Sequence, residues 1–215
     1  MEERIPATYI DKYGAVETEI LNDGVLLQTE INGTRFTGYN FNDFKIENAN
    51  QKPSRFSLND RNELTACELI YNLPLVLKYM DEDFQTVLNI SLIFDSSETK
   101  SYNDTNAVFR VKVHDREIVA NNVDLFEPGL ESIKNNLPKE YKLKCCYGCA
   151  FSDYSVYGQA FFGTMLCFKN IKMEYLKVNN KGEFMDIMDK RDAIVQETYL
   201  CNEFQEREKG TGYRG

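Results

Sequence analysis

Cysteines are the residues of this 215-residue chain whose types and spacing most directly suggest chemistry. Cys145, Cys146 and Cys149 lie within one short stretch, Cys-Cys-Tyr-Gly-Cys. Cys146 and Cys149 have the Cys-x-x-Cys spacing with which two thiolates hold one metal ion from a tight turn. Gly148 is the residue type that such a turn favours. The spacing therefore indicates half of a metal site.

A closed zinc site needs two further ligands. Cys167 ends the apolar run Phe-Phe-Gly-Thr-Met-Leu-Cys, and Cys201 follows a predicted strand, so these two can complete a four-thiolate set with Cys146 and Cys149. Two alternatives remain open. The cysteines can be separately packed thiols, or Cys146 and Cys149 can be a redox pair, although the surrounding sequence lacks the βαβ pattern of thioredoxin-type motifs.

The other two cysteines are expected in the core. In a predicted strand over residues 141–146, Cys145 shares a face with Tyr141 and Leu143, whereas Cys146 points the other way. Cys67 alternates with apolar residues in its own predicted strand. Buried thiols of this kind act as small apolar side chains.

A polar, aromatic loop follows the cysteine turn. Its residues Ser152, Asp153, Tyr154 and Tyr157 are predicted to contact a ligand or partner, as are Tyr213 and Arg214 of the glycine-rich end of the chain. The structural alternative is that Asp153 caps a short turn and the tyrosines pack on the cysteine turn.

The sequence contains few groups of residues that could act together in catalysis. The single histidine, His114, lies on the polar face of a predicted strand, so a buried nucleophile–histidine pair is not expected, and no nucleotide-binding or hydrolase motif occurs. We therefore expect no catalytic residues. The alternative is a redox or metal-dependent enzyme that uses Cys146 and Cys149, or Asp153 as a general base.

The surrounding elements are predicted to be mostly strands. Turns at Asp23-Gly24 and Asn32-Gly33 predict an N-terminal meander of hairpins, in which Ile20 pairs with Leu27 and Thr29 with Phe36. The meander places on one face Val16, Ile20, Val25, Leu27, Ile31 and Phe36, and on the other Glu17, Glu19, Gln28, Glu30 and Arg35.

Further along the chain, the alternation of apolar and polar residues predicts two sets of inward-facing side chains. They are Leu88, Ile90, Leu92 and Phe94, and then Phe109, Val111 and Val113. Helical spacing of apolar residues predicts a helix over 126–138. Residues 193–200 suggest a strand. The fold class is α+β, mostly antiparallel sheet with a few helices and a cysteine-rich C-terminal half. We expect one domain over 1–215, with possible sub-lobes 1–122 and 123–215 and any boundary near 122–140.

Composition limits the partners. A net charge of −9 repels nucleic-acid phosphate and suits a basic protein partner. No apolar run is long enough to cross a bilayer, and residues 1–14 show no secretory signal, so we expect a cytoplasmic protein without membrane contact whose cysteines are thiols or metal ligands.

Several blocks together resemble an uncharacterised bacterial family, a domain of unknown function. They are Tyr-Ile-Asp-Lys-Tyr-Gly near the start, the block Cys-x-x-Cys-Ala-Phe-Ser-Asp-Tyr-Ser, and the terminal Gly-Thr-Gly-Tyr-Arg-Gly. The resemblance implies a bacterial, cytosolic, single-domain protein and no particular activity. It also implies that Cys146, Cys149, Cys167 and Cys201 belong to the shared pattern. We expect a non-enzymatic binding protein, for example an immunity-type protein, with a structural zinc site.

Overall fold

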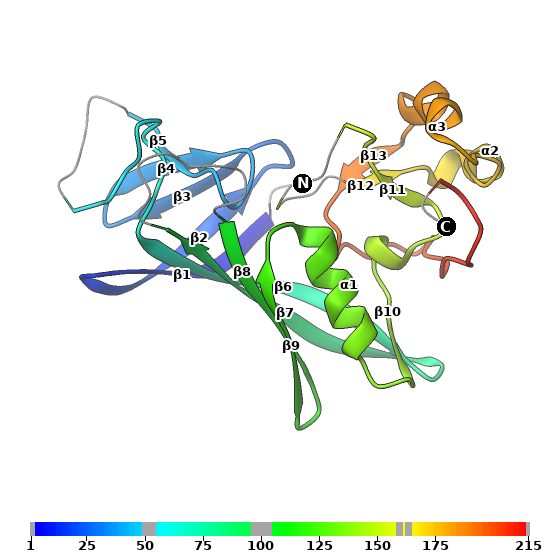
Figure 1. Ribbon diagram of the computed structural model, residues 1–215, viewed down its shortest axis with the longest axis horizontal. Helices are drawn as coiled ribbons and strands as arrows, with labels where there is room; N and C mark the ends of the chain where they lie inside the picture. Colours follow the sequence, from blue (N-terminus) through cyan, green and yellow to red (C-terminus); the bar gives the residue numbers. More distant parts are fainter. Residues whose placement is uncertain (1–2, 49–54, 96–104, 158–160, 162–164, 214–215) are drawn as a thin grey trace. The chain divides into compact units, whose positions relative to one another are not determined.

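The computed structural model describes residues 3–48, 55–95, 105–157, 161 and 165–213. Contacts divide the chain into two compact units (Figure 1). The first comprises 1–73 and 88–133, and the second 74–87 and 134–215. The division at 133–134 lies within the region 122–140, and the tip of one long hairpin, 74–87, belongs to the second unit. No helix among the described residues is long and apolar enough to span a membrane.

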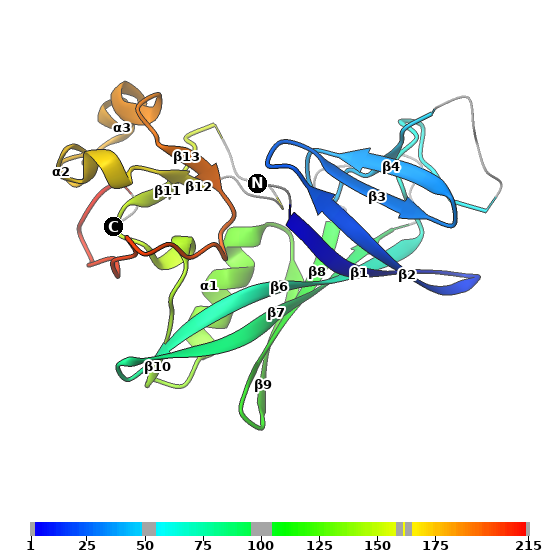
Figure 2. The same ribbon diagram turned by 180° about the vertical axis from the view of Figure 1, so that it is seen from behind.

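The first unit is built on an antiparallel sheet, seen from its other side in Figure 2. Among the described strands the order is β5-β4-β3-β2-β1-β6-β7-β8-β9. The bounds are β1 Glu3–Asp11, β2 Gly14–Asn22, β3 Leu27–Ile31, β4 Thr34–Gly38, β5 Lys45–Ile46, β6 Cys67–Tyr79, β7 Glu82–Phe94, β8 Thr105–Val113 and β9 Arg116–Val123. The predicted fold class, mostly antiparallel sheet beginning with a meander of hairpins, is confirmed.

Inward-facing residues of these strands agree with the predicted alternation. The side chains buried to at least nine-tenths include Leu88, Ile90, Leu92 and Phe94 of β7 and Phe109, Val111 and Val113 of β8. Cys67 of β6 is also buried, as expected from its alternation with Leu69 and Tyr71. Period-two alternation succeeds here because one face of each strand packs on the core.

The turn between β2 and β3 differs from the prediction. Asn22 pairs with Leu27, so the turn has four residues rather than two, and Ile20 pairs with Thr29 instead of Leu27. The Asp23 carboxylate explains the longer turn, because its Oδ1 accepts from the backbone N–H groups of Val25 at 2.8 Å and Leu26 at 2.7 Å. Val25, predicted inward, is consequently exposed in the turn. The two-residue shift leaves the buried face of β3 unchanged.

The second predicted turn is confirmed. Asn32 and Gly33 link β3 to β4, and both have positive φ, 49° and 75°. Thr29 pairs with Phe36, as predicted, and Glu30 pairs with Arg35 in the same register. Two consecutive positive φ values are what a type I′ hairpin turn requires, which is why asparagine followed by glycine marks it in the sequence.

The predicted helix at 126–138 is α1, Phe126–Asn136. Its buried residues include Phe126, Leu130 and Ile133, which recur at helical spacing. The ring of Phe126 packs edge-to-face on Phe109 of β8, with centroids 5.1 Å apart. A Cβ on Gly129 would lie 2.5 Å from Phe109, so glycine allows the helix to approach the sheet this closely.

The second unit holds shorter elements. They are β10 Tyr141–Leu143, a 3₁₀ helix Cys146–Gly148, β11 Ser152–Tyr154, β12 Met165–Cys167, a 3₁₀ helix Lys169–Ile171, α2 Lys172–Tyr175, α3 Lys181–Met188 and β13 Ala193–Val195. Strands β11, β12 and β13 form a separate antiparallel sheet. The strand suggested over 193–200 is thus limited to its first three residues. The core around this small sheet includes Phe151, Phe168, Tyr175 and Phe184.

Candidate metal centre

The Cys146–Cys149 turn is a short 3₁₀ helix, not the continuation of a strand. The N–H of Cys149 donates to the carbonyl of Cys146 at 3.1 Å, and the N–H of Gly148 donates to that of Cys145 at 2.9 Å. A Cβ on Gly148 would lie 3.0 Å from the carbonyl oxygen of Leu143, so glycine lets the turn fold back closely on β10.

This turn corrects the predicted orientation of Cys146. Strand β10 ends at Leu143, Cys145 is still extended, and the 3₁₀ helix begins at Cys146, so the alternation of a strand no longer applies from Cys146 onward. Both thiols are buried: Cys145, as expected, and also Cys146, which was placed on the opposite, polar face.

A second segment, residues 197–207, runs along the turn and holds it. The N–H of Cys146 donates to the carbonyl of Tyr199, and the N–H of Ala150 donates to that of Gln205, both at 2.7 Å. The N–H of Arg207 donates to the carbonyl of Gly148 at 3.0 Å. Cys201 lies within this segment and is therefore brought to the Cys146–Cys149 turn.

The small sheet positions the fourth cysteine. Cys167 ends β12 and pairs with Ser152 on one side and Ala193 on the other. The hydroxyl of Ser152 in turn donates to the carbonyl of Cys146, which ties the sheet to the turn. The element order thus gathers cysteines from three separate segments in one region of the second unit.

The thiols of this region influence the pKa values of Cys146 and Cys167. Burial raises the pKa of Cys146 far above its ordinary value, and the nearby thiols of Cys149, Cys145, Cys167 and Cys201 raise it further. Burial also raises the pKa of Cys167, against a backbone hydrogen bond from Lys169 that lowers it, and Cys201 and Cys149 add to the increase. Cys149 and Cys201 therefore each act on both Cys146 and Cys167.

The donor set suits zinc, but it is not preassembled. Four sulfur ligands are a common zinc environment, and the Lys169 N–H that faces Cys167 is the kind of donor that stabilises a metal-bound thiolate. Within the described ranges, however, no three His, Cys, Asp or Glu side chains already have the arrangement of a metal site. No disulfide joins any of the six cysteines, all of which the structure describes.

The predicted ligand-contacting residues have very different environments. Ser152, Asp153 and Tyr154 form β11 and are buried, with exposed fractions of 0%, 2% and 6%. Tyr157 is exposed by contrast, at 73%. Tyr213 is half-buried and stacks on Phe184 with ring centroids 4.9 Å apart. Arg214 lies outside the described residues.

Asp153 is part of a buried polar network. Its Oδ1 accepts from the N–H of Tyr154, and its Oδ2 accepts from the hydroxyl of Tyr175, both at 2.9 Å. Arg207 donates to that hydroxyl at 3.2 Å and to the carbonyl of Cys149 at 3.0 Å. Desolvation on burial is the main reason that the pKa of Tyr175 is raised, so this phenol remains a proton donor.

Tyr175 and Arg207 were not identified from the sequence. Tyr175 is one apolar position of a short helix, and Arg207 stands in a charged stretch that reads as solvent-exposed. Neither has a local motif. Their roles arise from contacts across 22 residues, from Tyr175 to Asp153, and across 55, from Arg207 to the carbonyl of Ser152.

The single histidine belongs to the first unit. His114 occupies the turn between β8 and β9 in the first unit, with a φ of 51°, and is exposed. Its place is a hairpin tip and not the polar face of a strand, because β8 already ends at Val113.

Comparison with known proteins gives a family. Residues 3–152 match the model of a family of unknown function, DUF6304, and the chain therefore belongs to that family. The matched region includes Cys146, Cys149 and Ser152 and ends before Cys167 and Cys201. No curated protein and no solved structure matches the chain.

Proposed function

We propose that this protein is a non-enzymatic binding protein of the bacterial cytoplasm whose cysteine-rich unit is stabilised by one zinc ion. The ligands are Cys146, Cys149, Cys167 and Cys201. One observation carries the proposal: separate segments, held by the small sheet and by residues 197–207, gather these thiols within electrostatic range. Zinc would draw the sulfurs together and tie the segments to one another.

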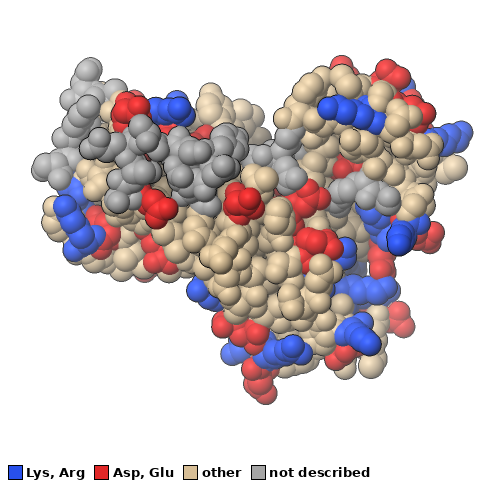
Figure 3. All heavy atoms as spheres, viewed as in Figure 1, with Lys and Arg blue, Asp and Glu red and all other residues tan. Residues whose placement is uncertain are grey.

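The partner in this proposal is a basic protein, as for an immunity-type protein that neutralises a toxin. The net charge of −9 supports such a partner. On the face shown in Figure 3, lysine and arginine side chains are interspersed with aspartate and glutamate, and no basic stripe stands out among the described residues that it shows. This distribution is consistent with a protein that does not bind nucleic acid.

The enzymatic alternative receives less support. Burial raises the pKa of the Cys146 thiol, which opposes the thiolate that redox exchange requires. The Asp153 carboxylate already accepts hydrogen bonds from Tyr154 and Tyr175 and is 2% exposed, so access of a substrate proton to it is restricted.

Two measurements test the two parts of this proposal. Elemental analysis of protein purified without chelator should give about one equivalent of zinc, and the thiols should react with a thiol reagent only after chelation. Zinc below about half an equivalent would contradict the four-cysteine site. A pull-down from the native host should recover a stoichiometric basic protein, and recovery of none would contradict the binding role.

A further inference from the structure

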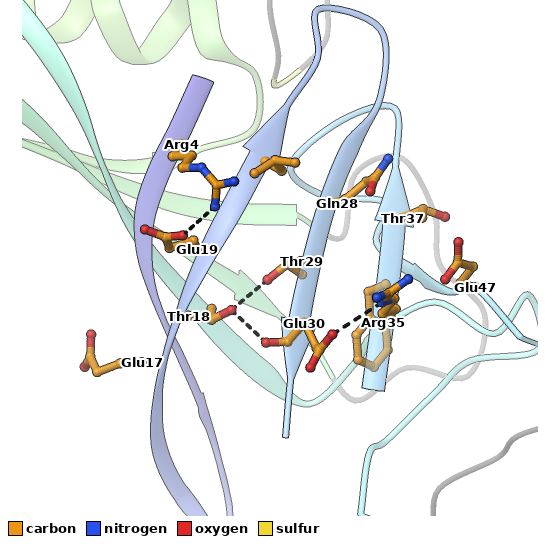
Figure 4. A pocket seen from close by; sticks show the side chains of 12 residues that line it. Arg4, Glu17, Thr18, Glu19, Gln28, Thr29, Glu30, Arg35, Thr37 and Glu47 are labelled. Atoms are coloured by element: carbon orange, nitrogen blue, oxygen red, sulfur yellow. Dashed lines mark hydrogen bonds and ion pairs between the residues drawn. The ribbon is translucent and has the colours of Figure 1, made fainter. Parts of the chain in front are cut away.

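A groove opens in the first unit where β2 and β3 separate (Figure 4). Strand β2 runs from Gly14 to Asn22, yet it pairs with β3 only from Ile20 onward. At Thr18 a side chain spans the gap: its hydroxyl donates to the carbonyl of Glu30 at 2.9 Å and lies 2.9 Å from the hydroxyl of Thr29. The groove has a volume of about 680 Å³.

At Glu17, Thr18 and Glu19, one wall of the groove belongs to an open strand edge that extends back to Gly14. Over residues 14–19, β2 pairs with β1 on one side, and no strand among the described residues pairs with it on the other. Such an edge presents backbone N–H and C=O groups that an extended peptide can pair with, adding a strand to the sheet. The shape of the site therefore suits an extended segment of chain.

The charges of the groove indicate what kind of segment it can bind. Its lining includes four carboxylates and two guanidinium groups, those of Glu17, Glu19, Glu30, Glu47, Arg4 and Arg35. The arginines form ion pairs with Glu19 at 3.2 Å and with Glu30 at 3.3 Å, and all four side chains are more than half exposed. Exposed pairs of this kind contribute little free energy, so incoming cations can replace them.

We propose that this groove binds an extended, basic segment of a partner protein, which adds to the edge of β2 at residues 14–19 and places lysine or arginine side chains against Glu17 and Glu30. The inference rests on the proposed binding role and names the surface for it. A second copy of this chain is a poorer occupant, since two chains of charge −9 repel each other.

The test uses the full-length protein and a synthetic peptide of alternating lysine and threonine. We expect calorimetry to detect binding at low salt and amide hydrogen exchange to show protection of β2 at residues 14–19. The double variant Glu17→Lys, Glu30→Lys should raise Kd by about tenfold or more, because it places like charges against the peptide. The milder Glu17→Gln, Glu30→Gln variant should also raise Kd.

Two controls separate this site from general attraction to an acidic protein. Glu117→Lys makes the same kind of charge change on β9, at the opposite end of the strand order, and should alter Kd by less than about twofold. A peptide with proline in place of threonine keeps its charge but lacks every second N–H, so it should not bind.

Equal weakening by the Glu117 and groove variants, unchanged binding of the proline peptide, or no binding at all would overturn the groove as the docking site. A wild-type protein that sediments as a dimer through the β2 edge would do so as well. The groove can fail while the binding role holds. If wild type and the groove variant retain a host partner equally, that partner binds elsewhere on the chain.

Discussion

The hydroxyl of Tyr175 donates to Oδ2 of Asp153 at 2.9 Å inside the cysteine-rich unit, where the two side chains are 0% and 2% exposed. The ring of Tyr175 also stacks on Phe168, with centroids 4.9 Å apart and planes at 7°. A buried carboxylate is costly unless its oxygens accept hydrogen bonds, so this contact stabilises the fold as well as orienting Asp153.

Tyr175→Phe should therefore destabilise the protein. The variant keeps the ring stack but removes a donor to the buried Asp153, and we expect a loss of about 1–3 kcal/mol in the free energy of unfolding. Chemical denaturation measures it. Tyr199→Phe, at a half-exposed tyrosine, is the matched control and should stay within about 0.5 kcal/mol of wild type. Equal stability of Tyr175→Phe and wild type would show that the contact contributes nothing.

Arg207 should not be replaceable by lysine. Its guanidinium donates to the carbonyls of Cys149, Ser152 and Thr211 and to the hydroxyl of Tyr175. A lysine ammonium cannot reproduce this planar set of donors, so Arg207→Lys should cost about 1–3 kcal/mol and speed proteolysis of residues 208–213.

The control for this change is Arg191→Lys. Arg191 donates to one carbonyl, that of Met188, and its nearby Asp189 carboxylate is almost fully exposed. Its replacement should cost less than about 0.5 kcal/mol. If both variants lost the same stability, the multiple contacts of Arg207 would not be the reason.

Tyr9 should make stability fall in alkali. Burial, followed by the neighbouring Cys67 and Asp11, raises the pKa of this phenol above its ordinary 10.0. The folded state then holds the proton at a pH where the unfolded chain releases it. The stabilisation is complete below pH 10.0 and is lost as the pH rises beyond it, by up to about 1.4 kcal/mol per pH unit.

Denaturant unfolding across this alkaline range checks the slope. Tyr9→Phe cannot titrate and should show a shallower decline, while its stability at neutral pH reports only the lost hydroxyl contacts. A slope identical to that of wild type would mean that Tyr9 ionises equally easily in the folded and unfolded chain.

Zinc content should respond to four cysteines and not to Cys67. Replacement of Cys146, Cys149, Cys167 or Cys201 by serine should reduce bound zinc from about one equivalent to well below half, because a structural site needs all four ligands. Cys67→Ala, in the core of the first unit, should leave the zinc content unchanged. Elemental analysis of each purified variant gives the answer, and zinc loss in Cys67→Ala alone would contradict the assignment.

The sequence by itself determined the local features of this fold. The alternation in β7 and β8, the helical spacing of Phe126, Leu130 and Ile133, and the turn at Asn32 and Gly33 each follow from interactions between residues near one another in the chain. The antiparallel class and the burial of Cys67 and Cys145 could therefore be predicted.

Only the tertiary structure decided what surrounds the candidate site. The sequence left open whether Asp153 contacts a ligand or caps a turn, whereas in the structure β11 pairs with β12 and Asp153 is buried beside Tyr175. Cys146, predicted on the polar face of a strand, is buried at the start of a 3₁₀ helix, and Thr18 lies at a groove because β2 and β3 part there. These contacts join residues far apart in the chain, and no local period or turn preference records which distant segments will meet.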